Sequence, residues 1–360
     1  MLMDVTRRQA ITALAAGGVV AGLAHGASVA TADTGPTGSG RHRIDLHSHF
    51  LPPRYRAALQ ASGYTLRSFV PVPSWSPAEA LAFMDAHGIG TQVLSISDPG
   101  VNFLPAAQAR SMNRYCNDYL ADLVARYPTR FGGFAFLPLP DVAASLAEIT
   151  HALDVRRLDG VALLSNYNGI YLGDTRFEPV MAALNARSAF VFVHPAELAP
   201  SNRPELPFPA FYEEYPFDTT RAAALLMATG TIDRYPNIRF SLAHAGGCVP
   251  FLSQRLSTPR QAFPSAPPVS VFGTDEKIRN FFYDTSLSSS PAAMRSVLEV
   301  TGIDHIVFGS DWPFSALTYR GQTGADPAPA LAEVFDPQQR YRIERLNALA
   351  QLPRLASRLS

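Results

Sequence analysis

The sequence is short of lysine, of cysteine and of net charge, and each shortage excludes a class of protein. Lys277 is the only lysine among 30 basic residues, and 30 acidic residues balance them. There is no basic run, so the chain lacks the electrostatic signature of a nucleic-acid-binding protein. Two cysteines, Cys116 and Cys248, are too few for a disulfide scaffold. A packed core must hold the fold, and 360 residues with 47% hydrophobic content suffice for one large barrel or two small domains.

A long hydrophobic run is also missing, and this decides how the N-terminus is interpreted. Arg7 and Arg8 precede an apolar run at residues 10–24 that glycines interrupt. This run is shorter than the roughly 18 to 20 apolar residues that a membrane span requires. The segment Ala30-Thr31-Ala32 then provides a cleavage motif. We therefore interpret residues 1–32 as a twin-arginine signal peptide, with a permanent membrane anchor as the alternative.

This interpretation predicts an exported protein, periplasmic or extracellular, with no membrane span after cleavage. Residues 33–42 are then a linker rich in glycine, threonine and serine, and residues 43–360 form one domain.

Eight short apolar runs alternate with longer amphipathic segments, which is the pattern of parallel strands joined by helices. The runs lie at residues 43–50, 91–97, 131–139, 160–166, 189–195, 238–246, 280–286 and 305–311. Helices are expected near residues 76–88, 106–127, 141–155, 176–187, 218–234, 291–301 and 337–350. This alternation predicts an α/β fold of the TIM-type (β/α)8 barrel class. The alternative, an open doubly wound sheet, usually carries a glycine-rich phosphate loop, and the sequence has none.

Three long connections, 51–75, 196–217 and 257–275, follow the carboxyl ends of predicted strands and are rich in proline and aromatic residues. Barrel enzymes build their sites on that face, so we expect lids there. Ordinary surface loops are the alternative.

Histidine falls at the ends of several predicted strands. His47 and His49 are two residues apart, so their side chains point to the same side of the first strand. His194 ends the fifth run, His244 the sixth and Asp311 the eighth. Strand ends that meet on one rim of a barrel can build a metal site from distant parts of the sequence. The remaining histidines lie in the signal, at strand starts or on helices and receive no chemical role: His25, His42, His87, His151 and His305.

These residues occur in motifs that follow one another in a fixed order. They are His47-Ser48-His49-Phe50, His194-Pro195, His244-Ala245-Gly246-Gly247 and Gly309-Ser310-Asp311-Trp312-Pro313. In these motifs the chain resembles the amidohydrolase superfamily over residues 43–350. Within that superfamily it resembles the branch of aminocarboxymuconate-semialdehyde decarboxylase and the aromatic-acid decarboxylases. The segments PPRYRAAL, PSWS, YLGD and DTSLSSSP are most similar to the 6-methylsalicylate decarboxylases.

The resemblance implies one divalent metal ion per subunit, bound by His47, His49, His194 and Asp311. Three neutral imidazoles and one carboxylate suit Zn²⁺, with Mn²⁺ as the alternative. Binuclear members of the superfamily bridge two metals with a carboxylated lysine on the fourth strand. The fourth run, residues 160–166, contains no lysine, so a single ion is expected.

The resemblance also implies an activity, the nonoxidative decarboxylation of a small aromatic hydroxy acid such as a salicylate. Asp311 would transfer a proton to the ring carbon and His244 would assist. Some relatives place a glutamate three residues after this histidine, but this chain has Gly247, so no relay through a glutamate is expected. The alternatives are a metal-dependent hydrolase of a lactone or amide, and a barrel that binds an aromatic acid without catalysis.

Three further residues are candidates for binding the substrate. Arg255 lies eleven residues after His244, a spacing shared with relatives whose arginine crosses from a neighbouring subunit, which implies a homodimer. Phe314 matches a position that packs on the substrate, and Trp75 lies on the first predicted lid. The alternatives are an ordinary surface arginine and aromatic residues that pack within loops.

Overall fold

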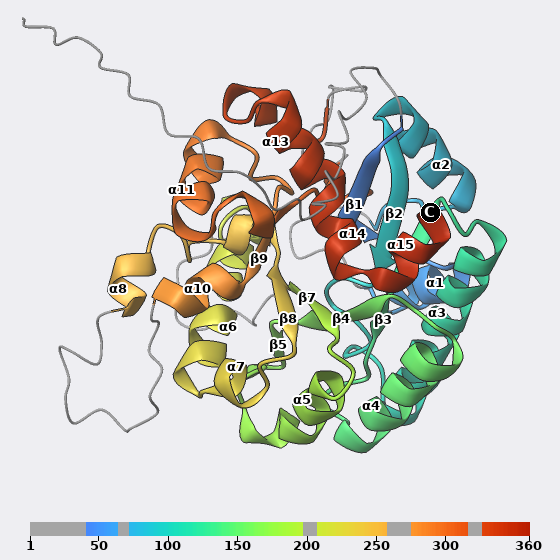
Figure 1. The fold of residues 1–360 in the computed structure, drawn as a ribbon. Helices are drawn as coiled ribbons and strands as arrows, with labels where there is room; N and C mark the ends of the chain where they lie inside the picture. Colours follow the sequence, from blue (N-terminus) through green and yellow to red (C-terminus); the bar gives the residue numbers. More distant parts are fainter. Residues whose placement is uncertain (1–40, 64–71, 197–206, 258–274, 316–325) are drawn as a thin grey trace, which may run out of the picture. The chain divides into compact units, whose positions relative to one another are not determined.

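Eight parallel strands form the centre of the protein, as Figure 1 shows. The computed structural model describes residues 41–63, 72–196, 207–257, 275–315 and 326–360. The predicted signal peptide and most of the linker lie outside these residues. The strands follow the order β1-β2-β3-β4-β7-β8-β9-β10, and every pair of neighbours in that order is parallel. Their bounds are β1 (Arg43–His49), β2 (Ile89–Ser95), β3 (Phe131–Phe136), β4 (Gly160–Leu164), β7 (Phe190–His194), β8 (Arg239–Leu242), β9 (Phe282–Asp284) and β10 (Ile306–Val307).

The segment that follows β10 closes the sheet against β1. The backbone N–H of Leu46 donates to the carbonyl of Phe308 at 2.9 Å, and that of Asp311 donates to the carbonyl of His47 at 2.7 Å. The N–H of His49 donates to the carbonyl of Trp312 at 2.8 Å. First and last strands are thus joined beyond the end of β10, and the predicted (β/α)8 barrel is confirmed.

Helices surround the barrel wherever the sequence predicted them, although several differ in their bounds. The helices are α1 (Pro53–Ala61), α2 (Pro77–Ala86), α3 (Ala106–Arg126), α4 (Val142–Ile149), α5 (Glu178–Asn185), α6 (Glu214–Ala228), α7 (Thr231–Arg234), α8 (Ser253–Ser257), α10 (Asp275–Asn280), α11 (Pro291–Thr301), α13 (Pro337–Tyr341), α14 (Asn347–Gln351) and α15 (Pro353–Leu359). Helix α2 begins as expected, because the Ser76 side chain accepts a hydrogen bond from the Glu79 N–H and Pro77 occupies the first turn. None of the helices described combines the length and the hydropathy needed to cross a membrane.

Two of these differences have a clear local cause. The helix expected at residues 218–234 begins at Glu214 and divides after Ala228, because Gly230 adopts a left-handed conformation with φ 71°. The connection 51–75 was expected to be a loop, yet it begins with α1. Tyr55 and Leu59 lie four residues apart and are both buried, so one face of this helix packs on the core.

One end of the barrel, where the strands begin, is closed by the C-terminal helices. Phe134, Phe190 and Phe192 stack inside the barrel, and the same buried cluster includes Ala348 of α14, Leu355 of α15 and Leu352 between the two helices. Arg354 of α15 donates to the carbonyls of Leu153 and Leu158, which precede β4. The functional side chains must therefore lie at the other end, where the strands finish.

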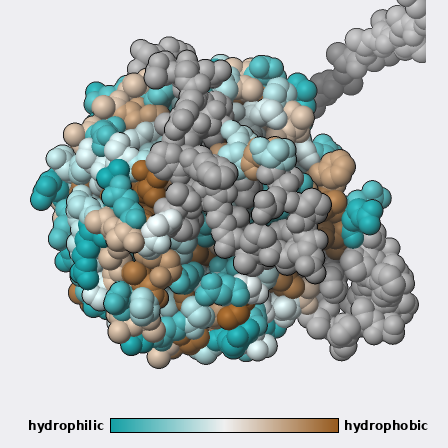
Figure 2. Space-filling view, turned by 180° about the vertical axis from the view of Figure 1, so that it is seen from behind, coloured by the Kyte–Doolittle hydropathy of each residue, from teal (hydrophilic) through white to brown (hydrophobic). Residues whose placement is uncertain are grey.

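The face seen in Figure 2 is mainly hydrophilic, with hydrophobic residues in small separate patches. Among the described residues, the large hydrophobic side chains that remain exposed are Val155, Phe208, Tyr212, Phe217, Phe251 and Leu346.

Candidate metal centre

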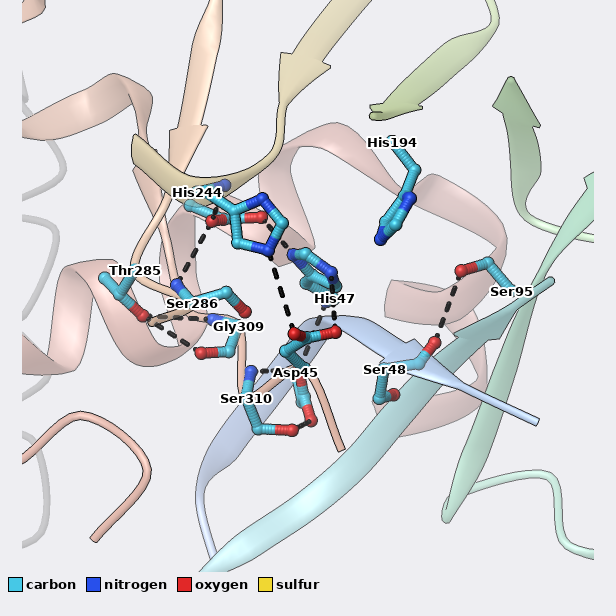
Figure 3. Close-up of polar contacts among 12 residues, drawn as sticks. Asp45, His47, Ser48, Ser95, His194, His244, Thr285, Ser286, Gly309 and Ser310 are labelled. Atoms are coloured by element: carbon cyan, nitrogen blue, oxygen red, sulfur yellow. Dashed lines mark hydrogen bonds and ion pairs between the residues drawn. The ribbon is translucent and has the colours of Figure 1, made fainter. Parts of the chain in front are cut away.

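The carboxyl ends of the strands bring histidines together from three separate stretches of sequence. His47 and His49 lie on β1, His194 ends β7 and His244 follows β8. Figure 3 shows the side chains of His47, His194 and His244. One ligand atom from each of His47, His194, His244 and Asp311 can be chosen so that all four lie within 4.8 Å of one another. All four residues are buried, so the arrangement is a compact polar cluster inside the mouth of the barrel.

His49 belongs to the same cluster. Its Nε2 lies 3.1 Å from the Nε2 of His47 and 3.1 Å from the Oδ1 of Asp311. The sequence assigned the metal to His47, His49, His194 and Asp311 and placed His244 beside it. The structure brings all five residues together, with His244 close enough to offer a ligand atom as well.

Hydrogen bonds made by the Nδ1 atoms fix the tautomer of three of the imidazoles. The Nδ1 of His47 donates to Asp284 at 2.6 Å, and the Nδ1 of His194 donates to the Pro195 carbonyl at 2.8 Å. The Ser95 hydroxyl donates to the Ser48 carbonyl, so it accepts from the Nδ1 of His49 at 3.0 Å. In the neutral form each ring therefore has its Nε2 lone pair free to point toward the centre, as a metal ligand requires.

The electrostatics of the cluster favour a positive charge. Burial alone would lower the pKa of His47, but Asp284 and Asp311 raise it to about 10. Burial, together with the neighbouring His49 and His47, lowers the pKa of His194 well below its usual value. Burial would raise the pKa of Asp311, but His47 and the other histidines hold it well below its usual range. The carboxylates therefore favour a positive charge beside His47, which either a proton on that ring or a bound metal ion can supply.

The donor set fits a divalent cation of the zinc or manganese type. Imidazole nitrogens and one carboxylate are the ligands that such ions prefer. In addition, the Nδ1 of His244 is buried and has no hydrogen-bond partner. A buried polar atom without a partner is costly unless a ligand satisfies it. The residues present therefore form a metal site.

Left-handed backbone conformations position two members of the cluster. His244 and Ala245 both have φ 55°, and Asp311 has φ 58°. The sequence placed His244 and Asp311 at the ends of strands, but β8 ends at Leu242 and β10 at Val307. His244 begins a short 3-10 turn after β8, whereas Asp311 lies in irregular chain that is hydrogen-bonded to β1. Such conformations cost roughly 1–2 kcal/mol each for residues with a side chain and are typical of functional sites.

Glycine makes the close approach of the strands possible. A Cβ at Gly309 would lie 2.7 Å from the Cβ of His47 and 2.8 Å from the Oγ of Ser286. No side chain fits there, so Gly309 allows the chain that leads to Asp311 to pass directly beside His47.

Sequence reasoning missed two buried carboxylates next to the cluster. Asp284 ends β9 and accepts from the His47 ring. Asp45 accepts from the backbone N–H of His47 and from both the N–H and the hydroxyl of Ser310. Like His194, Asp284 is a residue with an ionisable side chain near the end of an apolar run, here residues 280–286. The same pattern could therefore have identified it from the sequence.

The three residues expected to bind substrate have different surroundings. The Phe314 ring lies 5.5 Å from the His49 ring, at the mouth of the cluster. Trp75 is 93% buried and packs against Phe50 and Tyr119. Arg255 lies on α8 with an exposed side chain.

Another aromatic residue, which the sequence did not single out, lies beside His194. The Tyr215 ring of α6 is 6.0 Å from the His194 ring, and its hydroxyl donates to Asp98.

Two decarboxylases are similar in sequence to most of this chain. The chain is 36% identical to decarboxylase yanB of Aspergillus niger over 295 residues, which cover 77% of this chain and 78% of the relative. It is 35% identical to a 6-methylsalicylic acid decarboxylase of Penicillium expansum over 277 residues, which cover 75% of this chain and 85% of the relative.

Solved structures share the fold. The 5-carboxyvanillate decarboxylase of Sphingomonas paucimobilis aligns with a TM-score of 0.74 at 25% identity, over 87% of this chain and 99% of that one. A dihydroxybenzoic acid decarboxylase of Polaromonas sp. JS666, whose structure holds manganese and 2-nitroresorcinol, aligns with a TM-score of 0.68 at 22% identity, over 86% of this chain and 96% of that one. The amidohydrolase family itself matches residues 44–354, nearly the whole described domain. The chain therefore belongs to the amidohydrolase family.

Proposed function

We propose that the protein is a metal-dependent nonoxidative decarboxylase of a small aromatic hydroxy acid of the salicylate type. The observation that carries this proposal is the buried cluster of histidines and Asp311, in a chain 35% identical to a 6-methylsalicylic acid decarboxylase. A 6-alkylated salicylate is therefore the first acid to test.

One divalent ion per subunit would be held by His47, His194 and Asp311, together with His49 or His244. Zn²⁺ is the first candidate because imidazoles dominate the donor set, and Mn²⁺ is the second because of the manganese in the Polaromonas structure. When bound, such an ion fixes the carboxylate and the neighbouring hydroxyl of the acid and stabilises the negative charge that develops there. Metal analysis of the purified protein identifies the ion.

Asp311 is placed to handle the proton of the reaction. Direct loss of carbon dioxide would leave a carbanion on the ring, so the ring carbon that bears the carboxylate must be protonated first. The bond to the carboxylate then breaks, its electron pair returns to the ring, and carbon dioxide leaves. The Oδ1 of Asp311 lies 3.1–3.2 Å from the Nε2 atoms of His49 and His47, whereas its Oδ2 faces the Nε2 of His244 at 3.7 Å. We propose that Asp311, which is ionised at rest, takes up a proton from His244, passes it to the ring carbon and so returns to its ionised form.

The test is a comparison of products on a panel of substrates. The metal-loaded protein is incubated with salicylate, 6-methylsalicylate and dihydroxybenzoates, and separately with aromatic lactones and amides. We expect carbon dioxide and the matching phenol from the acids, with no ring opening or amide cleavage. Hydrolysis of a lactone or amide without release of carbon dioxide would replace this proposal with the hydrolase alternative.

We also propose a homodimer in which Arg255 reaches the substrate of the neighbouring subunit. Two observations support it: Arg255 is exposed on α8, and Phe251, four residues earlier, is 85% exposed. Aromatic residues and arginine are enriched in protein–protein interfaces. Analytical ultracentrifugation of wild type and Phe251→Asp tests this. A dimer that the substitution dissociates supports the proposal, and a monomeric wild-type protein contradicts it.

Finally, we propose that residues 1–32 direct export through the twin-arginine pathway. The twin arginine and the short interrupted apolar run support this. Fusing these residues to a reporter that is active only outside the cytoplasm tests it, with Arg7→Lys/Arg8→Lys as the control. Export that persists in the control contradicts the proposal.

A further inference from the structure

Asp284 contacts two members of the metal centre at once. It ends β9, and its side chain is 1% exposed. The Oδ2 atom accepts a hydrogen bond from the Nδ1 of His47 at 2.6 Å. The Oδ1 atom accepts from the backbone N–H of His244 at 2.8 Å and from that of Ser286 at 3.1 Å. A single carboxylate therefore touches one histidine through its ring and another through its backbone.

The contact with His47 determines which ring nitrogen faces the centre. Because Oδ2 can only accept, the hydrogen of a neutral His47 must lie on Nδ1. The Nε2 atom is then left with a lone pair, 3.1 Å from the Nε2 of His49 and 3.2 Å from the Oδ1 of Asp311. A metal ion needs this lone pair, so the orientation of His47 as a ligand depends on Asp284.

The contact with His244 holds a strained turn. His244 and Ala245 both have φ 55°, a conformation that residues with a side chain seldom adopt. The hydrogen bond from the His244 N–H to Asp284 is buried, and it fixes the turn at its first residue. The same carboxylate thus sets the direction of the His244 side chain as well.

We propose that Asp284 is a positioning residue that fixes the His47 tautomer and the His244 turn together, and so sets the affinity of the site for its metal. It does not itself bind the ion, because both of its oxygens are already engaged by hydrogen-bond donors. This inference rests on the metal site and not on the identity of the acid, so its test requires no substrate.

The substitution Asp284→Asn separates the two contacts. The amide oxygen keeps the two backbone N–H groups as partners, so the amide NH₂ must face the Nδ1 of His47. Two donors cannot face one another, and His47 must move its hydrogen to Nε2, where it blocks the metal. We expect metal affinity to fall by about 10- to 100-fold. The measurement is calorimetric titration of the metal-free protein with Zn²⁺ or Mn²⁺ alone.

A matched control is available two residues before His47. Asp45 is also fully buried, but it contacts the backbone of His47 and not its ring. In Asp45→Asn the new amide hydrogen can be accepted by Gln92, whose Oε1 is buried without a hydrogen-bond partner. We expect this variant to retain metal affinity close to that of the wild type. Equal affinity in wild type and Asp284→Asn would overturn the proposal, and so would an equal loss in both variants.

A spectroscopic measurement on the wild-type protein keeps the test decisive if Asp284→Asn does not fold. In protein labelled with [¹⁵N]histidine, NMR reports which ring nitrogen of His47 carries the hydrogen. We expect a hydrogen-bonded Nδ1–H that persists when Zn²⁺ is added. A His47 ring whose only hydrogen lies on Nε2 would contradict the proposed role of Asp284.

Discussion

Charged side chains have different partners at the two ends of the barrel. Where the strands begin, arginines meet carboxylates directly: Arg43 pairs with Asp326 and Glu344 at 2.8–2.9 Å, and Arg358 pairs with Asp159 at 2.9 Å. Where the strands finish, His47, His49, His194, His244 and Asp311 crowd together with no arginine or lysine among the contacts described for them.

This difference indicates that the first end contributes to stability and the second end to function. At the first end Arg43 and Arg358 have opposite charges as partners, so these contacts hold the chain after β10 to the barrel. At the second end a carboxylate and imidazole lone pairs share a buried space, an arrangement that folding alone does not favour. A bound cation supplies the missing charge. Changes at the two ends should therefore affect different measurements.

The largest expected effect is that of removing a ligand. His194→Ala should abolish metal binding and decarboxylation together, because His194 projects its Nε2 into the cluster from β7. Metal content by mass spectrometry and release of carbon dioxide are measured on the same preparation. His87→Ala removes an imidazole that packs against Phe83 at the end of α2 and should change neither quantity. Turnover by a metal-free His194→Ala variant would contradict the mechanism.

The next effect belongs to the other end. Arg358→Met leaves the Asp159 carboxylate, whose side chain is 0% exposed, without its guanidinium partner. We expect a loss of about 3 kcal/mol in the free energy of unfolding. Urea denaturation measures this loss, and metal affinity should be unchanged. Loss of metal affinity without loss of stability would show that the two ends are not separate.

The dependence of stability on pH is a smaller effect at the same end. Burial would raise the pKa of Glu344, but hydrogen bonds from His42 and Arg43 hold it below its usual value of 4.5. Ionised Glu344 therefore contributes stability above about pH 4.5, which is lost as the pH falls through the lower folded-state pKa. Glu344→Gln should cost about 1–2 kcal/mol at pH 7 and less at low pH. A cost that does not change with pH would contradict this.

The smallest effect is expected at the mouth of the metal centre. Phe314 lies against His49, and we expect its ring to pack on the aromatic acid. Phe314→Leu should raise KM for a salicylate by about 2- to 12-fold, the worth of one aromatic contact, with metal affinity unchanged. An unchanged KM would show that the Phe314 ring packs only against the protein and not on the acid.

Much of the fold and of this site could be predicted from the sequence, because the pattern of apolar runs indicates both the strands and the residues that lie at their ends. The alternation of His47 and His49 gave a shared face, and His194 at the end of an apolar run gave a second position on the same rim. The chain order and the TIM-type barrel followed from eight such runs. The helix α1 was within reach too, since Tyr55 and Leu59 have helical spacing.

The remaining features depend on contacts between distant residues. The ends of β8 and β10 were placed too late because the left-handed turns at His244 and Asp311 arise from packing against neighbouring strands. The roles of Asp284 and Asp45 depend on which backbone and ring atoms face them across the barrel. A pattern along one chain does not specify such pairings.

The most direct test of the central claim is to titrate metal into the chelated protein while measuring release of carbon dioxide from 6-methylsalicylate. We predict no release from the metal-free protein and full recovery at one equivalent of Zn²⁺ or Mn²⁺ per subunit, as the one cluster found among the described residues, His47, His194, His244 and Asp311, requires. Undiminished release of carbon dioxide from protein that contains no metal would contradict the account.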